Sequence, residues 1–319
     1  MKVLRFLLIL GVCFLSGEIL VRFADSFKLT GLDVVPLKPM KHYKETEEYF
    51  RPSDEIRVLL LGDSVFTGLG VDEENFFSQV LHRKLQEKFS GKRVRVIDEM
   101  LWGYNTYRKW QVFERFMNRA EKPTIIFYDY SLEDVEGGFP ERGEAPVRSS
   151  APGFGGPAGE LFLKNALKLF NHSMLFCYLK PRVTLFLWQK GIAVPASRMW
   201  HMMHDAYKPE NVGWMATQKY LSLMHEKSRA SGIVFMMHRA PDFLLYPDDP
   251  YVMPVHALRT FCQDHQIELI DSSPLFHGYS GKDLRISPID GHPNALANRI
   301  IAEHAASWIA ERLAGAGRA

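Results

Sequence analysis

Short apolar runs alternate with amphipathic stretches along most of the chain. The runs lie at 57–62, 93–98, 124–130, 232–237 and 267–271. The first is apolar from Val58 to Leu61, which is the pattern of a strand buried on both faces of a parallel sheet. The stretches between them repeat apolar residues every three or four positions, as in Phe77, Leu81, Leu85 and Phe89. Strands that alternate with helices predict a mostly parallel sheet with helices on both faces, a three-layer α/β/α sandwich.

The helices that we expect between these strands are defined by the same spacing. They lie at 107–120, 218–230 and 255–265, and a last helix begins at Pro293. Proline is tolerated in the first turn of a helix because its missing N–H has no intrahelical partner there.

The N-terminus has the pattern of a targeting segment. Residues 1–5 are basic and 6–17 carry no charge, a length that suits a signal peptide and is short of the roughly 20 residues of a spanning helix. Glu18 and Arg22 are four apart on a helix and can pair, which extends the apolar stretch. No small-x-small cleavage site follows, so we expect an uncleaved signal anchor, with a cleaved signal peptide as the alternative.

The chain divides into segments of different composition. We expect an anchor or signal peptide at 1–25, a linker at 26–54, one α/β domain at 55–314 with an insertion at about 137–215, and a tail at 315–319. The insertion begins rich in Gly, Pro and Arg and continues with aromatic residues, which we interpret as a lid or a substrate-shaping element.

Composition excludes some classes of function. The 319 residues have a net charge of +2 and no basic run, so the sequence does not favour nucleic-acid binding. Three cysteines are too few for a disulfide framework. Cys177 and Cys262 can pair or remain two buried thiols, and the sequence leaves both possibilities open.

Two segments that are far apart in sequence carry the candidate chemistry. Gly62-Asp63-Ser64 follows the first apolar run, and Asp290 and His292 lie two residues apart before the last helix. A serine hydroxyl becomes a nucleophile when a base takes its proton and a third group orients that base. Residues two apart on an extended segment point the same way, so Asp290 can orient His292. We expect Ser64, His292 and Asp290 to form a catalytic triad.

Two further residues are candidates for the same site. Gly103, in the Trp102-Gly103-Tyr104-Asn105-Thr106 turn after the second strand, can offer its N–H to an oxyanion together with the N–H of Ser64. We expect Asp63 and Asn105 to be turn residues. Ligands of parallel sheets bind beyond the carboxyl ends of the strands, where these turns meet.

The ordered motifs resemble those of the SGNH/GDSL hydrolases. The Gly-Asp-Ser block, the glycine block around Gly103 and the Asp290-to-Asn294 block match that family over about 57–313. The resemblance implies a flavodoxin-like sheet and a site that acts on esters. The family's third block carries an asparagine that donates to the oxyanion, and Glu133 stands in its place here. Glu133 is therefore a further oxyanion candidate if it is protonated and donates. The alternatives are that it turns toward Arg108 or another cation and leaves a two-amide oxyanion site, or that the activity is lost.

These observations predict a membrane-anchored, extracytoplasmic serine esterase, which is secreted if the N-terminal segment is cleaved. The expected substrate is an acyl ester, such as an O-acyl group of a cell-envelope glycan or a lipid. Alternatives are a polysaccharide O-acetyltransferase with the same triad and a degenerate glycan-binding protein. No cofactor or metal is expected, since His201, His204 and Asp205 lack a full ligand set. Trp188, Trp200 and Trp214 can stack on sugars, but packing is their commoner use.

Overall fold

The computed structural model describes residues 13–23, 48–68, 70–101, 103–142, 203–243, 245–247, 251–287 and 290–316. The chain divides into two compact units, one made of residues 1–37 and 148–198 and one made of residues 38–147 and 199–319. The strands and the candidate site described below lie in the second unit.

Residues 13–23 are helical in the first unit, and Arg22 Nε donates to Glu18 Oε1 at 2.7 Å, as the sequence predicts. The rest of the expected anchor (1–12, 24–25), the linker from 26 to 47 and the insertion from 143 to 202 lie outside the described residues. Among the helices that are described, none is long and apolar enough to cross a membrane. The anchor stays a prediction.

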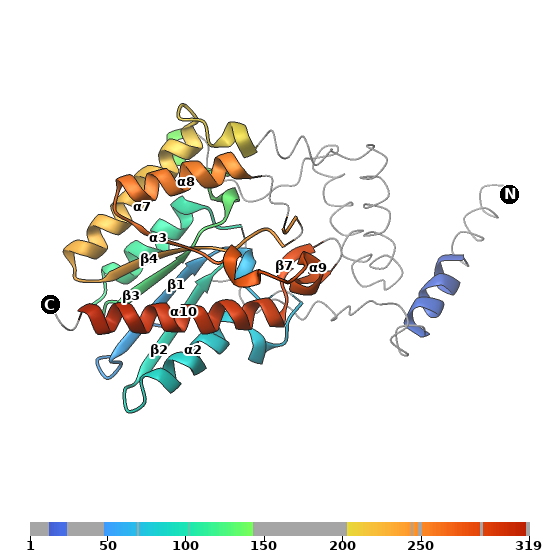
Figure 1. Cartoon of the computed structure of the whole chain (residues 1–319), viewed down its shortest axis with the longest axis horizontal. Helices are drawn as coiled ribbons and strands as arrows, with labels where there is room; N and C mark the ends of the chain where they lie inside the picture. The colour runs from blue at the N-terminus through green and yellow to red at the C-terminus, as the bar shows by residue number, and fades with distance from the viewer. Residues whose placement is uncertain are drawn as a thin grey trace, which may run out of the picture. The chain divides into compact units, whose positions relative to one another are not determined.

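A five-stranded parallel sheet forms the centre of the second unit (Figure 1). Its strands are β1 (Ile56–Gly62), β2 (Val94–Met100), β3 (Ile125–Asp129), β4 (Val234–Arg239) and β5 (Glu268–Asp271). The order β2-β1-β3-β4-β5 is the flavodoxin-like order. The predicted parallel sheet is therefore confirmed.

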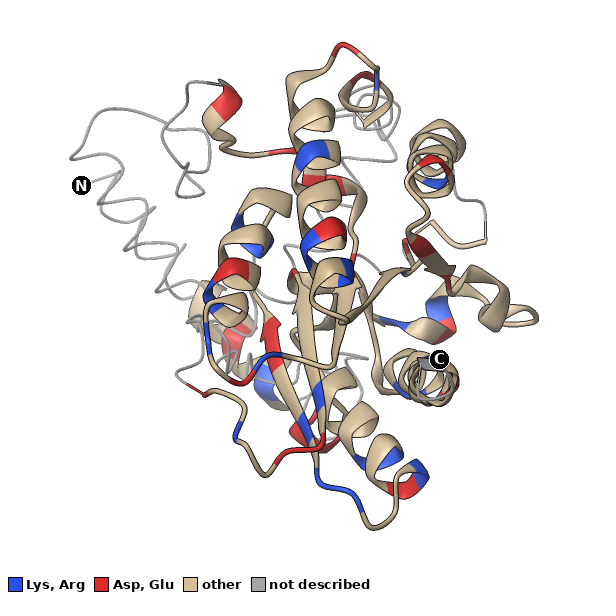
Figure 2. Cartoon of the chain, turned by 90° about the vertical axis from the view of Figure 1, so that its left-hand side faces the viewer, with Lys and Arg blue, Asp and Glu red and all other residues tan. Residues whose placement is uncertain are grey.

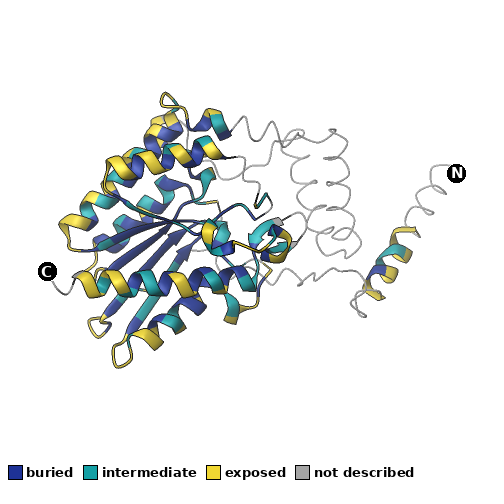
Figure 3. Ribbon diagram, viewed as in Figure 1, coloured by how far each residue is buried: buried dark blue, intermediate teal, exposed yellow. Residues whose placement is uncertain are grey.

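Helices cover both faces of this sheet (Figures 1 and 3). The first face packs against α2 (Phe77–Lys88) and α10 (Ala295–Ala316), and the second against α3 (Thr106–Met117), α7 (Val212–Ala230) and α8 (Val252–Asp264). Successive residues of β1 point to opposite faces: Val58 and Leu60 join the first core, and Leu59 and Leu61 join the second. All four are fully buried, so residues 58–61 are apolar because both faces of the strand are covered.

α7 and β4 are among the elements that extend beyond their predicted ends. α7 begins at Val212 because the Asn211 side chain accepts hydrogen bonds from the N–H groups of Gly213 and Trp214. The insertion predicted to run to about 215 therefore ends before this core helix. β4 continues past Met237, since His238 pairs with a carboxylate of the neighbouring strand.

A small antiparallel hairpin precedes the last helix and was not predicted. It consists of β6 (Arg285–Ser287) and β7 (Asp290–Pro293). The expectation that Pro293 opens the last helix is wrong, because Pro293 ends β7 and α10 begins at Ala295. The Asn294 side chain accepts from the N–H groups of Leu296 and Ala297 and so caps α10. Residues 315 and 316, expected in the tail, still belong to this helix.

Short 3-10 helices occupy the turns at the strand ends and around the hairpin. They are η1 (Ser64–Phe66), η2 (Glu73–Asn75), η3 (Leu132–Val135), η4 (Pro140–Arg142) and η5 (Ser273–Phe276), with a one-turn α-helix, α9 (Gly281–Leu284), before β6. Figure 2 shows Lys and Arg interspersed with Asp and Glu over the described helices in view.

Candidate active site

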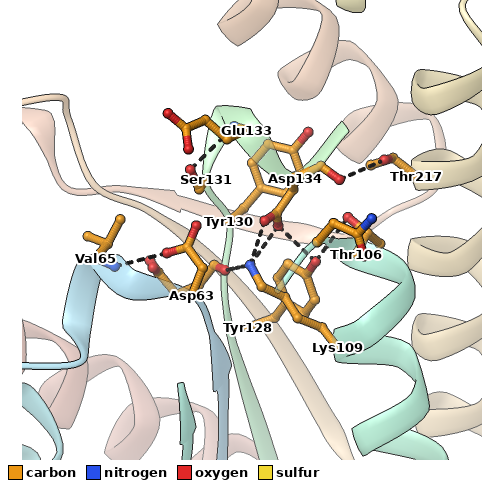
Figure 4. Close-up of polar contacts among 12 residues, drawn as sticks. Asp63, Val65, Thr106, Lys109, Tyr128, Tyr130, Ser131, Glu133, Asp134 and Thr217 are labelled. Carbon is orange, nitrogen blue, oxygen red and sulfur yellow. Dashed lines mark hydrogen bonds and ion pairs between the residues drawn. The ribbon is translucent and has the colours of Figure 1, made fainter. Parts of the chain in front are cut away.

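The nucleophile candidate lies in the turn that follows β1. Gly62 is packed so closely that a Cβ would lie 2.9 Å from Met100 Cγ and 3.3 Å from Asp129 Cβ, so a side chain would displace its neighbours. Asp63 Oδ1 accepts from the N–H of Val65 at 3.0 Å and caps η1 (Figure 4). The structural role expected for Asp63 is confirmed, and Ser64 opens the turn directly after it.

His292 meets this serine from the other end of the chain. Its Nε2 lies 3.1 Å from Ser64 Oγ, across 228 residues of sequence. His292 is in β7, so its backbone is extended as the following proline predicts. A hydrogen bond from Asn294 Nδ2 to the Asp283 carbonyl oxygen, at 2.8 Å, ties the end of the hairpin to α9. The geometry is that of a hydroxyl with a base within proton-transfer reach.

Asp290 lies on the same short strand, two residues before His292. Its backbone pairs with Ser287 in the hairpin. The position of its side chain lies outside what the structure describes. The role of Asp290 as the orienting acid therefore stays a prediction from the two-residue spacing.

Gly103 has the backbone conformation that its turn requires. Its φ is +73°, a value that favours glycine, and no atom lies within 4 Å of a Cβ built there. Its identity is therefore explained by conformation rather than by lack of space. Asn105 caps α3 by accepting from the Arg108 N–H at 3.1 Å, and its Nδ2 donates to the Glu136 carbonyl oxygen at 2.9 Å. The turn role expected for Asn105 is thus confirmed.

Glu133 lies in η3, the turn that follows β3. Loss of water around the carboxyl group and the charges of Asp63, Glu136 and Asp242 raise the pKa of Glu133 to about 7, against an opposing effect of His292. The side chain keeps exposed surface, since it borders two cavities. A substantial fraction is therefore protonated near neutral pH.

The ion pair of Glu133 with Arg108 that the sequence allows is not formed. The Arg108 guanidinium instead donates to Gln111 Oε1 at 3.1 Å. Within the described residues, the Glu133 carboxyl group forms no ion pair or hydrogen bond. Its N–H donates to Ser131 Oγ at 3.3 Å, which caps the turn (Figure 4).

Two cavities of about 390 and 410 Å³ border the nucleophile, and both are lined by Asp63, Ser64, Glu133 and His292. The smaller also contacts Gly103, Asn105, Arg108 and Glu136, and the larger contacts Leu132, Met203, Arg239, Pro241 and Tyr251. The turns after β1, β2, β3 and β4 thus meet at one edge of the sheet, as predicted for residues that follow parallel strands.

Two buried polar pairs beside the site were missed by sequence reasoning. Lys109 Nζ contacts Asp134, and His238 Nδ1 lies 2.7 Å from Asp129 Oδ1. A signal for the first existed: Lys109 shares the helical spacing of Val112, Phe113 and Phe116, all buried, so it lies on the core side of α3. No comparable pattern marks the second pair, which depends on the register between β3 and β4.

The remaining candidates from the sequence are tryptophans, cysteines and possible metal ligands. Trp214 is buried against Tyr207 and Phe261, so it packs the core and is not a sugar platform. Trp188, Trp200, Cys177 and His201 lie outside the described residues. Cys262 is a buried free thiol. In the part of the chain that is described, no group of three His, Cys, Asp or Glu side chains is arranged to hold a metal ion.

Comparisons with known proteins found matches among solved structures. No protein family and no curated protein matches the sequence. Among solved structures, a protein described as lipolytic and of the G-D-S-L family from Desulfitobacterium hafniense DCB-2 is 14% identical, with a TM-score of 0.41 and coverage of 78% of this chain and 97% of its own.

Two esterases are similar at the same level. The esterase EstA from Pseudoalteromonas sp. is 12% identical (TM-score 0.43; 81% of this chain, 98% of its own). AlinE4, an SGNH-hydrolase family esterase, is 16% identical (TM-score 0.33; 68% of this chain, 76% of its own). The matched structures thus include the SGNH and G-D-S-L hydrolases that the motifs resemble. Because this similarity is low, the inference about function depends on the geometry of the site residues.

Proposed function

We propose that this chain is a serine hydrolase of the SGNH type that cleaves carboxylic esters. The observation that carries the proposal is the 3.1 Å contact between Ser64 Oγ and His292 Nε2 at the mouth of two cavities. A lone serine most often caps a turn, but here Asp63 makes the capping hydrogen bond and leaves the Ser64 hydroxyl to the imidazole.

The reaction follows from this geometry in two half-reactions. Ser64 Oγ attacks the acyl carbon while its proton moves to His292 Nε2, and the N–H groups of Ser64 and Gly103 receive the oxyanion. His292 then gives that proton to the departing alcohol, which leaves an acyl-serine. Water attacks the acyl-serine and loses a proton to His292. The bond between the acyl carbon and Ser64 Oγ then breaks as His292 returns that proton to Oγ, which restores Ser64 and releases the acid. Asp290 orients the imidazole throughout.

The protonation state of Glu133 distinguishes a working esterase site from one that has lost its activity. Its carboxyl group can complete the oxyanion site only when it is protonated, because an ionised carboxylate has no proton to donate and repels the oxyanion. The raised pKa of about 7 supports a protonated donor in neutral and mildly acidic conditions. We therefore favour a working esterase over a degenerate binding protein.

The proposed substrate is an O-acyl ester of a cell-envelope glycan or lipid, with a sugar hydroxyl in place of water for a transferase. This rests on the predicted anchor at 1–25, which would place the site outside the cytoplasm. Retention of the full chain in membranes after a carbonate wash, with its basic N-terminus intact, would support the anchor. A free mature protein that begins after Gly17 or Ala24 would show a cleaved signal.

The test of the proposed chemistry is labelling of the full-length protein with a fluorophosphonate, which reacts with activated serines. We expect wild type to be labelled on Ser64, Ser64→Ala to remain unlabelled, and His292→Ala to label at least about a hundredfold more slowly. Equal labelling of wild type and Ser64→Ala would refute the proposal. Ser307→Ala, a serine of α10 whose hydroxyl bonds the Glu303 carbonyl oxygen, is the matched control.

A further inference from the structure

A fully buried lysine lies behind the Glu133 turn. The Lys109 side chain of α3 has no exposed surface, and its ammonium group has three acceptors: both Asp134 carboxylate oxygens at 2.7 Å and the Asp129 carbonyl oxygen at 2.8 Å (Figure 4). An ammonium group has three protons, so these contacts satisfy all of its donors. The lysine therefore joins α3 to the end of β3 and to η3 at once.

Asp134, the residue after Glu133, is held from several sides. The Tyr128 hydroxyl donates to its Oδ2 at 3.0 Å, and the Thr217 hydroxyl of α7 donates to its carbonyl oxygen at 3.4 Å. Its own N–H donates to the Ser131 carbonyl oxygen at 2.9 Å. Because Glu133 and Asp134 are neighbours in one turn of 3-10 helix, fixing Asp134 also fixes the backbone of Glu133.

Stability alone does not explain this pair. Burial raises the pKa of Asp134, with Lys109 opposing the rise, because desolvation penalises the charged carboxylate. Replacing a buried ion pair by neutral side chains of similar volume is often neutral or stabilising. A position that costs free energy to bury and sits beside a site residue points to a role in the site.

We propose that Lys109 and Asp134 are positioning residues, whose buried ion pair holds the Glu133 turn against the start of α3, where Gly103 and Asn105 border the same cavity. This proposal rests on the proposed esterase function. The Lys109 and Asp134 side chains are buried and act through the placement of Glu133. An oxyanion donor must lie within a few tenths of an ångström of its place, and a shift of about 1 Å can lower turnover roughly a hundredfold.

The test removes the pair without leaving a buried charge alone. Lys109→Met with Asp134→Asn keeps an acceptor for the Tyr128 hydroxyl. We expect kcat for p-nitrophenyl acetate at pH 6 to fall about ten- to a hundredfold with KM changed less than about threefold, because the oxyanion contact strengthens in the transition state. Retained circular dichroism and cooperative thermal unfolding would show that the variant folds.

The same substitutions made in a Glu133→Ala variant distinguish a positioning role from a general disturbance of the site. In Glu133→Ala the pair has nothing left to position, so adding Lys109→Met/Asp134→Asn should lower kcat less than about twofold further. Independent effects that multiply would overturn the proposal, as would full activity of the pair variant. The control is Glu114→Gln/Lys227→Met, which removes another ion pair of α3, at 2.6 Å, and should leave kcat within about twofold.

Amide hydrogen exchange gives a readout that needs no activity. We expect residues 131–137 to exchange at least about tenfold faster in the Lys109→Met/Asp134→Asn variant and unchanged in the control. Unchanged exchange would refute the positioning role. Absence of Ser64-dependent turnover in wild type would refute the esterase function, while the exchange measurement would still decide the role of the pair.

Discussion

The turns that follow β1 and β3 are built alike and present different chemistry. Each leaves a buried parallel strand and forms a short 3-10 helix whose first N–H groups bond a capping side chain, Asp63 in one turn and Ser131 in the other. The first turn places Ser64 against His292, and the second places Glu133 beside the same cavities with no ion-pair or hydrogen-bond partner for its carboxyl group among the described residues.

The difference shows that the local pattern sets the geometry of a turn and the neighbours set its chemistry. Ser64 gains a base because the β6–β7 hairpin brings His292 across the sheet edge. Glu133 is instead partly desolvated and close to the acidic groups Asp63, Glu136 and Asp242, so it holds its proton more tightly than a carboxyl group in water. In the proposed mechanism, the first turn supplies the nucleophile and the second supplies a hydrogen-bond donor that depends on pH.

The largest effect on activity is expected when Ser64 or its base His292 is replaced. Ser64→Ala and His292→Ala should each lower kcat for p-nitrophenyl acetate by about 10⁴-fold or more, because the nucleophile and its base act as a unit. Steady-state kinetics measure this, with Ser307→Ala as a control on the surface of α10. Wild-type turnover in Ser64→Ala would mean that Ser64 is not the nucleophile.

Asp290→Asn should have the next largest effect. An asparagine cannot stabilise the imidazolium that forms on His292, so we expect kcat to fall about a hundred- to ten-thousandfold with residual activity. Asp264→Asn, at the exposed end of α8, is the matched control and should behave as wild type. Full activity of Asp290→Asn would assign the orienting role to another group.

Substitution of Glu133 should change how the rate depends on pH. The rate of wild type should fall as pH rises through about 7, because Glu133 loses the proton that it donates. Glu133→Gln and Glu133→Asn carry an amide donor that does not titrate, so their rates should stay level to pH 9. They should be unchanged at pH 6 and up to about tenfold faster than wild type at pH 8.

A pH–rate profile of kcat/KM from pH 5 to 9 measures this difference. A common fall in acid is expected in all three proteins, since His292 must be neutral to accept a proton. A large loss of activity in Glu133→Asn with an intact fold would reveal a role of the Glu133 carboxylate as a base or ligand. The same alkaline fall in variant and wild type would assign it to another group.

The smallest expected effect is on stability. The pKa of Glu133 is raised in the folded chain, so the folded state binds more protons than the unfolded state between about pH 4.5 and 7. The free energy of unfolding contributed by this group is therefore present below pH 4.5 and is lost as pH rises to about 7. Glu133→Gln escapes this loss and should be more stable by about 1 kcal/mol at pH 8, after allowance for solvent screening, and equal at pH 4. Thermal unfolding at both pH values measures it.

Much of the fold could be predicted from the sequence because most of its elements are specified by neighbouring residues. β1 is apolar from Val58 to Leu61 and was predicted to within one residue, and the apolar spacing of α2 marks its buried face. The ends of elements were harder to predict where a helix cap or a polar side-chain pair lies at the end, as Asn211 does for α7 and His238 for β4. Pro293 was misplaced for a similar reason, because pairing with Arg285 extends β7 through it and leaves the capping of α10 to Asn294.

Hydrophobic periodicity and turn chemistry act over a few residues, so the sequence predicted the parallel sheet, the strand-end turns and the candidates Ser64, Gly103, Asp290 and His292, and the family resemblance added Glu133. The tertiary structure brings Ser64 against His292 as predicted, raises the pKa of Glu133 and buries Lys109 on Asp134. These properties arise from desolvation and from charges brought together across the sheet. Both depend on distances in space that spacing along a chain does not encode.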